Sequence, residues 1–396
     1  MKASHLKSLG IAIFSTFAIV SCSSNTSTES GNSNLEGNYE LVKVDSLMVP
    51  VLEPLQITDF NPKTNRFLAY GTQSKACMEI DAEGNVLNSV DLTGEGPGHF
   101  GPGMSGLGYL GDNIVVEGAG AYNFFDADWN YLEKFTPGSG YIPLSYISGK
   151  PDAVVEINGV NTVIKAKSQN YNGNVELKEG HFNTAMMLEA FNSKSQEPTE
   201  LLPYPENSIY RTSELYFDGH EPKISYNKQK EELILVLPLE PKIYKYELKN
   251  NQFEFVSTSN LDLKNFRTPQ GIPYEDQHKN PLKNFGRSNE LNYVYRVLNS
   301  SVLDVNSYGE ITMIRYKTGA KEPTNITRFE EALKYAKSES ETLYSFFVKD
   351  KMVLETDIDL GRYVRLSETQ FLVPYVNEEE ELDYNKFYIY ELKKIE

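Results

Sequence analysis

Short runs of alternating apolar and polar residues make up most of the chain from residue 39 onward, and Asn, Gly, Asp or Pro separates one run from the next. Alternation with a period of two predicts β-strands, and these four residue types favour turns. Tyr and Phe are abundant, with 26 and 20 copies, which favours strands over helices. The pattern therefore predicts a mostly-β protein.

A short motif recurs along these runs: an apolar residue, an acid, a tight turn and a new strand. It stands at 80–86 (IDAEGNV) and again at 125–131 (FDADWNY). Partial copies keep the apolar–acid pair or a looser form of it, and they lie at 190–192, 246–252, 305–309, 347–350 and 390–392. The copies at 305–309 and 347–350 are alternatives for the interval before the last copy. Each copy is typical of the outer hairpin of a four-stranded unit. Repeated units of this kind predict a β-propeller.

The two ends of this region each lack a partner. The run at 39–49 (YELVKVDSLMV) precedes the first unit, and the last unit contains only three evident strands. Pairing the two satisfies both unpaired edges, so residues 37–396 are expected to form one propeller that strand 39–49 closes. Six blades fit the length better than seven, which is the alternative, because the interval from 246 to 390 also carries a helix and a long polar insertion. A β-sandwich or two smaller β-domains is the other structural alternative.

One segment has helical spacing. Thr327 and Glu330 form a capping box, in which each side chain satisfies a backbone amide of the first turn. Phe329, Leu333 and Ala336 follow on one face. The spacing predicts a short helical insertion at 327–338.

The first residues of the chain have the features of a bacterial lipoprotein signal. Lys2 and Lys7 precede an apolar stretch at 9–20, and Ser21 comes before Cys22. The stretch is shorter than the ~20 residues that span a bilayer as a helix. We therefore expect residues 1–21 to be removed and Cys22 to carry the lipid, with the alternative of an ordinary secretory signal and a chance cysteine.

Residues 22–36 are rich in Ser, Asn, Thr and Gly, which predicts a flexible spacer between the lipid and the propeller. No acidic residue follows Cys22 until Glu29. This spacing favours an outer-membrane anchor that faces the periplasm over one exposed at the cell surface.

Taken together, these segments resemble a known class of protein. The hairpins at 80–86 and 125–131 look like blades of NHL and TolB-like six-bladed propellers. With Cys22 and the turn at 94–98 (GEGPG), the chain resembles the uncharacterised six-bladed propeller lipoproteins of Bacteroidetes. The resemblance implies the fold and the envelope location. It implies no catalytic residue, because that family has no established reaction.

Charge and cysteine content narrow the classes of partner. The net charge of −17 repels nucleic acid, so no nucleic-acid partner is expected. With Cys22 lipidated, Cys77 has no partner for a disulfide, and its place in an apparent strand predicts burial.

No cofactor or metal site is expected. Residues 96–101 (GPGHFG) match a dinucleotide fingerprint, but Pro97 and Pro102 remove backbone amides, and the residues that follow predict a strand, so the segment is expected to be an inter-blade loop. The histidines have no metal-ligand spacing. Asp357 and Asp359 share one face of an expected strand, and 218–221 and 378–383 are expected to be solvated turns. No catalytic residue is predicted.

A basic and aromatic segment contrasts with this acidic background. Residues 264–287 contain five Lys or Arg residues, and two tyrosines and an arginine follow on the next strand. Guanidinium groups bind carboxylates and sulfates in a bidentate way, and aromatic rings stack on sugars. The candidate ligand-binding residues are Arg267, Tyr274, His278, Arg287, Tyr293 and Arg296. The alternative is an insertion that only increases solubility.

These patterns predict a lipid-anchored binding or scaffold module for an anionic glycan or a protein partner. One alternative is an envelope enzyme, such as a glycan lyase, hydrolase or lactonase, with its site at the propeller channel. Another is an assembly partner in a larger envelope complex, which requires an exposed apolar patch.

Replacing Cys22 with Ser should block lipidation, because the acyl chains are attached through this residue. We expect the Cys22→Ser protein to accumulate as a full-length precursor that incorporates no labelled palmitate. A Cys77→Ser control should incorporate label like the wild type. Wild-type labelling of the Cys22→Ser protein would contradict the lipoprotein assignment.

Overall fold

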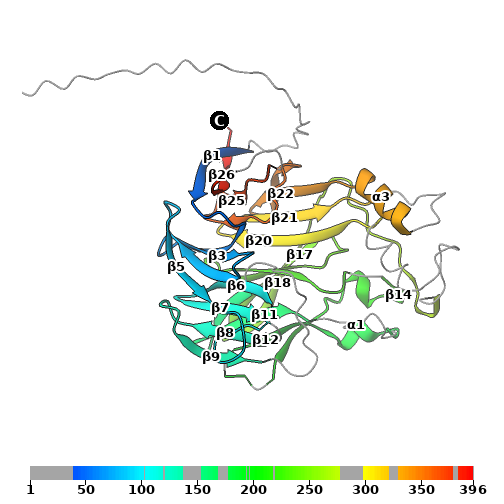
Figure 1. Ribbon diagram of the computed structural model, residues 1–396. Coiled ribbons are helices and arrows are strands. Elements are labelled where there is room, and N and C mark those ends of the chain that lie inside the picture. The colour runs from blue at the N-terminus through cyan, green and yellow to red at the C-terminus, as the bar shows by residue number, and fades with distance from the viewer. Residues whose placement is uncertain are drawn as a thin grey trace, which may run out of the picture. The chain divides into compact units, whose positions relative to one another are not determined.

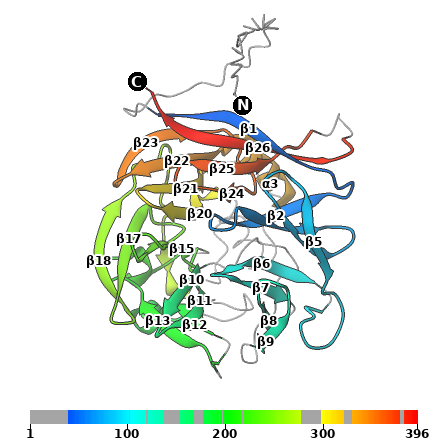
Figure 2. The same cartoon turned by 90° about the vertical axis from the view of Figure 1, so that its left-hand side faces the viewer.

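The computed structural model describes residues 39–101, 103–118, 121–136, 153–167, 177–192, 194–195, 197–216, 219–276, 298–320, 329–377 and 382–395. These residues form six four-stranded antiparallel sheets (Figure 1). The sheets follow one another around a common centre in chain order (Figure 2). The fold is a six-bladed β-propeller, as the repeat pattern predicts, and not a seven-bladed one.

We number the blades in chain order and give their strands from the innermost outward. Blade 1 contains β2 (Leu55–Asn61), β3 (Arg66–Gly71), β4 (Ala76–Ile80) and β5 (Val86–Asp91). Blade 2 contains β6 (Met104–Leu110), β7 (Asn113–Gly118), β8 (Ala121–Phe125) and β9 (Tyr131–Phe135). Blade 3 contains β10 (Ala153–Ile157), β11 (Val160–Ala166), β12 (Met186–Phe191) and β13 (Thr199–Pro203).

Blade 4 contains β15 (Lys223–Asn227), β16 (Glu232–Val236), β17 (Lys242–Lys249) and β18 (Gln252–Asn260). Blade 5 contains β20 (Ser301–Tyr308), β21 (Ile311–Lys317), β22 (Thr342–Val348) and β23 (Lys351–Thr356). Blade 6 contains β24 (Val364–Arg365), β25 (Gln370–Pro374), β26 (Asn385–Lys394) and β1 (Tyr39–Val49).

Blade 6 thus takes its strands from opposite ends of the described chain. β1 pairs antiparallel with β26, from Tyr39 opposite Lys394 to Val49 opposite Asn385. Leu41, Leu47 and Val49 are buried on β1. Each edge satisfies the backbone groups of the other, and the pairing closes the ring.

Side chains reinforce the seam where blade 6 meets blade 1. The Asn385 side-chain amide donates to the carbonyl oxygens of Val51 and Glu53 at 2.7 and 2.9 Å, and its oxygen accepts from the Leu55 amide at 2.9 Å. Gly84, with φ of 91°, lies so close to β1 that a Cβ there would stand 2.0 Å from the Met48 carbonyl oxygen. Only glycine fits this approach.

The recurring sequence motif corresponds to one turn geometry. Asp81 accepts a hydrogen bond from the Asn85 amide at 2.7 Å, and Asp126 accepts one from the Asn130 amide at 2.8 Å. Each Asn side chain donates to the second carboxylate oxygen at 2.9 Å. These bonds, the Asn side-chain amide first, hold the pKa of both aspartates below its ordinary value. The acid of the motif is therefore a turn-forming residue.

Most predicted outer hairpins are confirmed. The copies at 80–86, 125–131, 190–192, 246–252 and 347–350 lie at the turns between the third and fourth strands of blades 1 to 5. The copy at 305–309 is wrong, because it falls at the inner hairpin between β20 and β21. The competing copy at 347–350 is the outer hairpin of that blade.

The helical insertion lies between β21 and β22. Helix α3 spans Phe329–Glu339, whereas the predicted cap Thr327 lies outside the described residues. A second short helix, α1 (His181–Thr184), was not predicted. None of the described helices has the length and apolar character needed to cross a membrane.

The core consists of apolar layers between neighbouring blades. Cys77 is fully buried on β4 in the layer between blades 1 and 2, and burial raises the pKa of its thiol to about 12. The predicted burial of Cys77 is confirmed. Residues 94–101 connect β5 to β6 through a bridge between Gly94 and Gly101, so a strand follows this loop, as predicted.

Candidate ligand-binding face

The two faces of the ring carry connections of very different length. Strand direction alternates within each blade, so alternate connections fall on opposite faces. On one face, which we call the turn face, the connections are tight: 62–65, 81–85, 111–112, 126–130, 158–159, 192–198, 228–231, 250–251, 309–310, 349–350 and 366–369. These turns leave little chain for a binding site.

The opposite face, which we call the loop face, receives every long connection. These are 92–103, 136–152, 167–185, 204–222, 261–300, 318–341 and 375–384. Helices α1 and α3 and the short strand β14 (Glu214–Leu215) all lie at the right-hand end of Figure 1. Blades 3 to 5 contribute most of the extra chain.

A buried carboxylate fixes part of the loop face. Glu240, in the connection between β16 and β17, is 1% exposed. It accepts hydrogen bonds from the Ile209 amide at 3.1 Å, from the Tyr244 hydroxyl at 2.8 Å and from the Ser208 hydroxyl, and it pairs with Lys242 at 3.4 Å. The carboxylate therefore ties the connection 204–222 to blade 4.

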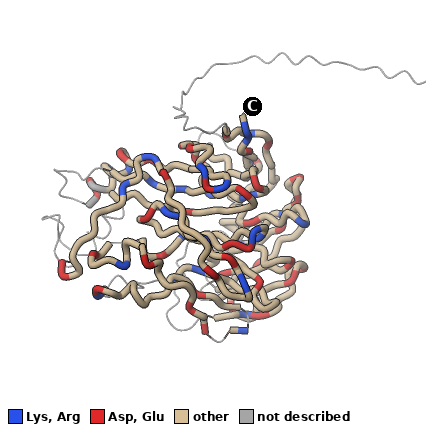
Figure 3. The backbone as a smooth tube through the Cα atoms, turned by 180° about the vertical axis from the view of Figure 1, so that it is seen from behind, with Lys and Arg blue, Asp and Glu red and all other residues tan. Residues whose placement is uncertain are grey.

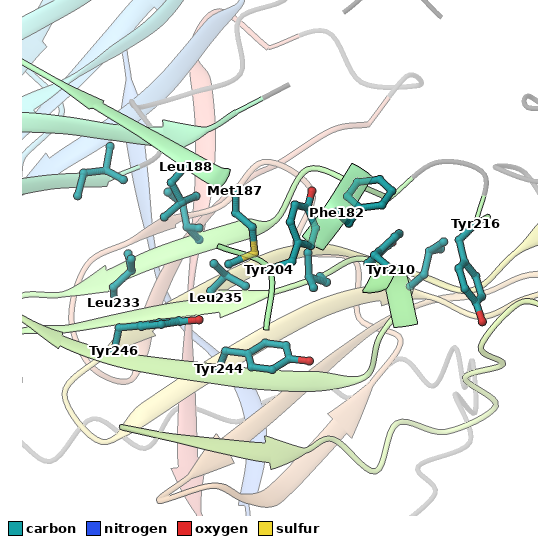
Figure 4. Packing of buried hydrophobic residues seen from close by; sticks show 14 of the residues in the cluster. Phe182, Met187, Leu188, Tyr204, Tyr210, Tyr216, Leu233, Leu235, Tyr244 and Tyr246 are labelled. Atoms are coloured by element: carbon teal, nitrogen blue, oxygen red, sulfur yellow. The ribbon is translucent and has the colours of Figure 1, made fainter. Parts of the chain in front are cut away.

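Aromatic side chains pack in the layer between blades 3 and 4, which includes Tyr244, a hydrogen-bond donor to Glu240 (Figure 4). The Phe182 ring centroid lies 4.9 Å from that of Tyr204 and 5.5 Å from that of Tyr210. The Tyr204 and Tyr210 hydroxyls donate to the carbonyl oxygens of His220 and Gly219, each at 2.6 Å. Burial raises the pKa of Tyr204 above its ordinary value. The described residues of these connections therefore pack as one layer against blades 3 and 4.

The predicted ligand residues fall in different environments. Arg267 is exposed, and its backbone amide donates to the Ser300 hydroxyl at 2.8 Å. Tyr274 is 8% exposed and belongs to the aromatic layer of blades 3 and 4. Its burial does not fit the predicted stacking on a sugar. The remaining candidates, His278, Arg287, Tyr293 and Arg296, lie outside the described residues.

Tyr274 is buried because its segment returns to the protein body. Strand β19 (Ile272–Pro273) pairs with β14, placing Ile272 opposite Leu215. Burial raises the pKa of the Tyr274 hydroxyl, which has no hydrogen-bond partner among the described residues. The apolar residues at 271–273, directly before Tyr274, are the sequence feature that could have predicted this pairing and the burial of Tyr274.

The carboxylates on the described part of the chain do not assemble a metal centre. No group of three or more His, Cys, Asp or Glu within that part could hold a metal ion. The expectation that Asp357 and Asp359 share a strand face is wrong, because β23 ends at Thr356. Asp359 accepts hydrogen bonds from the Gly361 amide and the Tyr344 hydroxyl, so it fixes a loop.

No protein-family model matches the chain, and no curated protein resembles it in sequence. Solved structures do resemble it. A member of the DUF4221 family from Bacteroides vulgatus superposes with a TM-score of 0.64 at 11% identity, over 91% of this chain and 100% of that chain. A protein from Bacteroides fragilis described as exported superposes with a TM-score of 0.53 at 12% identity, over 92% and 98%. At these identities the likeness shows the fold alone.

Replacing Glu240 with Ala should destabilise the protein, because three hydrogen-bond donors and the Lys242 ammonium lose their common buried acceptor. We expect the free energy of unfolding to fall by about 3 kcal/mol, which urea denaturation measures. Glu254→Ala, at an exposed carboxylate on β18, should change it by less than ~0.5 kcal/mol. Equal stability of the two variants would contradict the anchoring role of Glu240.

Proposed function

We propose that this protein is a lipid-anchored binding or scaffold module of the cell envelope, and that it binds an anionic glycan or an acidic protein partner on its loop face. The asymmetry of the connections carries the proposal. Tight turns are enough to connect the strands of a blade, so the extra chain on one face is more than the six blades require. Long connections on a rigid scaffold are common sites of binding.

The packing of the loop face supports a preorganised surface. Glu240 anchors the connection 204–222, and the ring of Phe182 packs against Tyr204 and Tyr210. Side chains that are already ordered lose less conformational entropy when a ligand binds. The face can therefore present a ligand contact without folding around it.

Charge supports an anionic ligand at the basic insertion. Acidic and basic residues are interspersed along the described chain (Figure 3), whereas the net charge of the whole sequence is −17. Lys264 and Arg267 are exposed at the start of the insertion. Cations grouped on such a background would attract an anion that the rest of the surface repels.

The envelope location is supported by the sequence around Cys22 and by a likeness of fold. The Bacteroides fragilis protein with this fold is described as exported. A lipid at Cys22, followed by the spacer 22–36, would hold the propeller close to the outer membrane and facing the periplasm.

Replacing Arg267 and Arg287 together with Ala should weaken binding of an anionic glycan more than tenfold, a loss above ~1.4 kcal/mol. Chondroitin sulfate and polygalacturonate serve as probes, with affinity measured by biolayer interferometry at two salt concentrations. The salt dependence should also become weaker, because fewer cations attract the ligand.

The matched control removes two cations from the turn face, in the Lys63→Ala/Lys230→Ala variant. This control should bind like the wild type. Equal loss of affinity in both double variants would mean that general charge, and not the loop face, carries the binding. Failure of wild-type protein to bind either probe would exclude these glycan classes as ligands.

A further inference from the structure

Blade 6 has an unusually short innermost strand. β24 has two residues, whereas the innermost strands of the other blades have five to eight. Val364 and Arg365 pair with Leu372 and Phe371, and β25 continues through Pro374 without an inner partner among the described residues. Because proline has no N–H, the end of this strand has one donor fewer to satisfy.

A pocket occupies the space beside this short strand. It lies at the boundary of blades 1 and 6, where β24 neighbours β2 (Figure 2), and its volume is about 240 Å³. Its wall is mostly apolar, with Leu55 and Ile57 from blade 1 and Leu372 and Phe387 from blade 6. An apolar wall of this kind favours a hydrocarbon group.

The polar atoms of the pocket are mainly donors. An Arg362 guanidinium nitrogen donates to the Gln56 side-chain oxygen at 2.8 Å, which leaves the Gln56 NH₂ group and the other guanidinium N–H groups available. Arg362 has no ion-pair partner among the described residues. The Thr72 hydroxyl donates to the Pro54 carbonyl oxygen at 3.1 Å. An uncompensated cation beside an apolar wall favours an anionic group.

The loop that carries Arg362 is held firmly. Leu360 is fully buried, and the Gly361 amide donates to Asp359 at 2.8 Å. The Tyr363 hydroxyl donates to Asp304 on β20 at 2.7 Å. These contacts on both sides fix the backbone at Arg362, while its side chain is exposed. The guanidinium is therefore displayed from a preorganised backbone.

The Glu53 carboxylate, two residues before Leu55 of the pocket wall, already has hydrogen-bond partners. Glu53 accepts from the amides of Gln73 and Ser74, each at 2.8 Å, and from the Ser74 hydroxyl. It stabilises the turn at 72–75 and forms no ion pair with Arg362. A ligand is therefore free to supply the missing negative charge.

We propose that this pocket binds a small molecule with one carboxylate and a hydrocarbon portion of roughly six to ten carbons. The carboxylate accepts hydrogen bonds from Arg362 and Gln56, and the hydrocarbon lies against Leu372 and Phe387. The volume fits, because an apolar cavity of about 150 Å³ already holds a benzene molecule. The pocket is separate from the basic insertion of the proposed function, because it lies between blades 1 and 6 and the insertion connects blades 4 and 5.

The test compares ligands that differ only in charge. Calorimetry at neutral pH measures the binding of 3-phenylpropionate and octanoate, and of the alcohols 3-phenylpropan-1-ol and octan-1-ol, to the full propeller. We expect each carboxylate to bind at least tenfold more tightly than its alcohol. Equal affinities, or no binding of either carboxylate at millimolar concentration, would overturn the proposal.

Three variants test whether the preference for carboxylates over alcohols arises in this pocket. Arg362→Gln should remove the preference for carboxylates, and Thr72→Phe, at the rim, should weaken the binding of all four ligands. Lys75→Gln removes a nearby cation, whose ammonium contacts the Thr72 carbonyl oxygen at 2.7 Å, and should keep the preference. Unchanged melting temperatures show that the variants fold. A preference retained in Arg362→Gln, or lost equally in Lys75→Gln, would overturn the proposal.

Discussion

The pairing of β1 with β26 is the contact on which the rest of the described structure depends. A propeller blade buries its faces only against neighbouring blades, so a ring that opens exposes two apolar faces at once. Hydrogen bonds along β1 close the ring, and Asn385 binds the backbone that leads from blade 6 into blade 1. The Met48 carbonyl oxygen, against Gly84, joins the same seam to the first repeated hairpin. Closure therefore combines strand pairing with specific contacts between blades.

Much of the fold could be predicted because the repeat has a local physical cause. The Asp81–Asn85 and Asp126–Asn130 turns form from side chains four residues apart, so the sequence pattern reports them directly. The copy at 305–309 was misassigned, because a strand, a short turn and a strand look alike in inner and outer hairpins. The position of a hairpin in its blade depends on long-range pairing, which a local pattern does not contain.

The candidate sites were harder to predict for the same reason. Tyr274 lies in a segment that is polar in composition, yet the pairing of β19 with β14 brings it into the core. The sequence did not identify Arg362 as a site residue, because its position beside a pocket depends on the short length of β24 and on contacts with blade 1, such as Leu55, at the other end of the chain. The pocket and the long connections both mark departures from the regular repeat. Such departures are where a repeated scaffold can acquire function without losing its core.

Native-state hydrogen exchange of the β1 and β26 amides tests the closure most directly. If this pairing holds the ring together, the slowest amides in both strands exchange only through global unfolding. They then share one opening free energy with the slowest amides of β3 in blade 1 and β21 in blade 5. An opening free energy for β1 that is lower by more than about 2 kcal/mol, with the other blades still protected, would show that β1 detaches alone. That result would contradict its role as the strand that closes the ring.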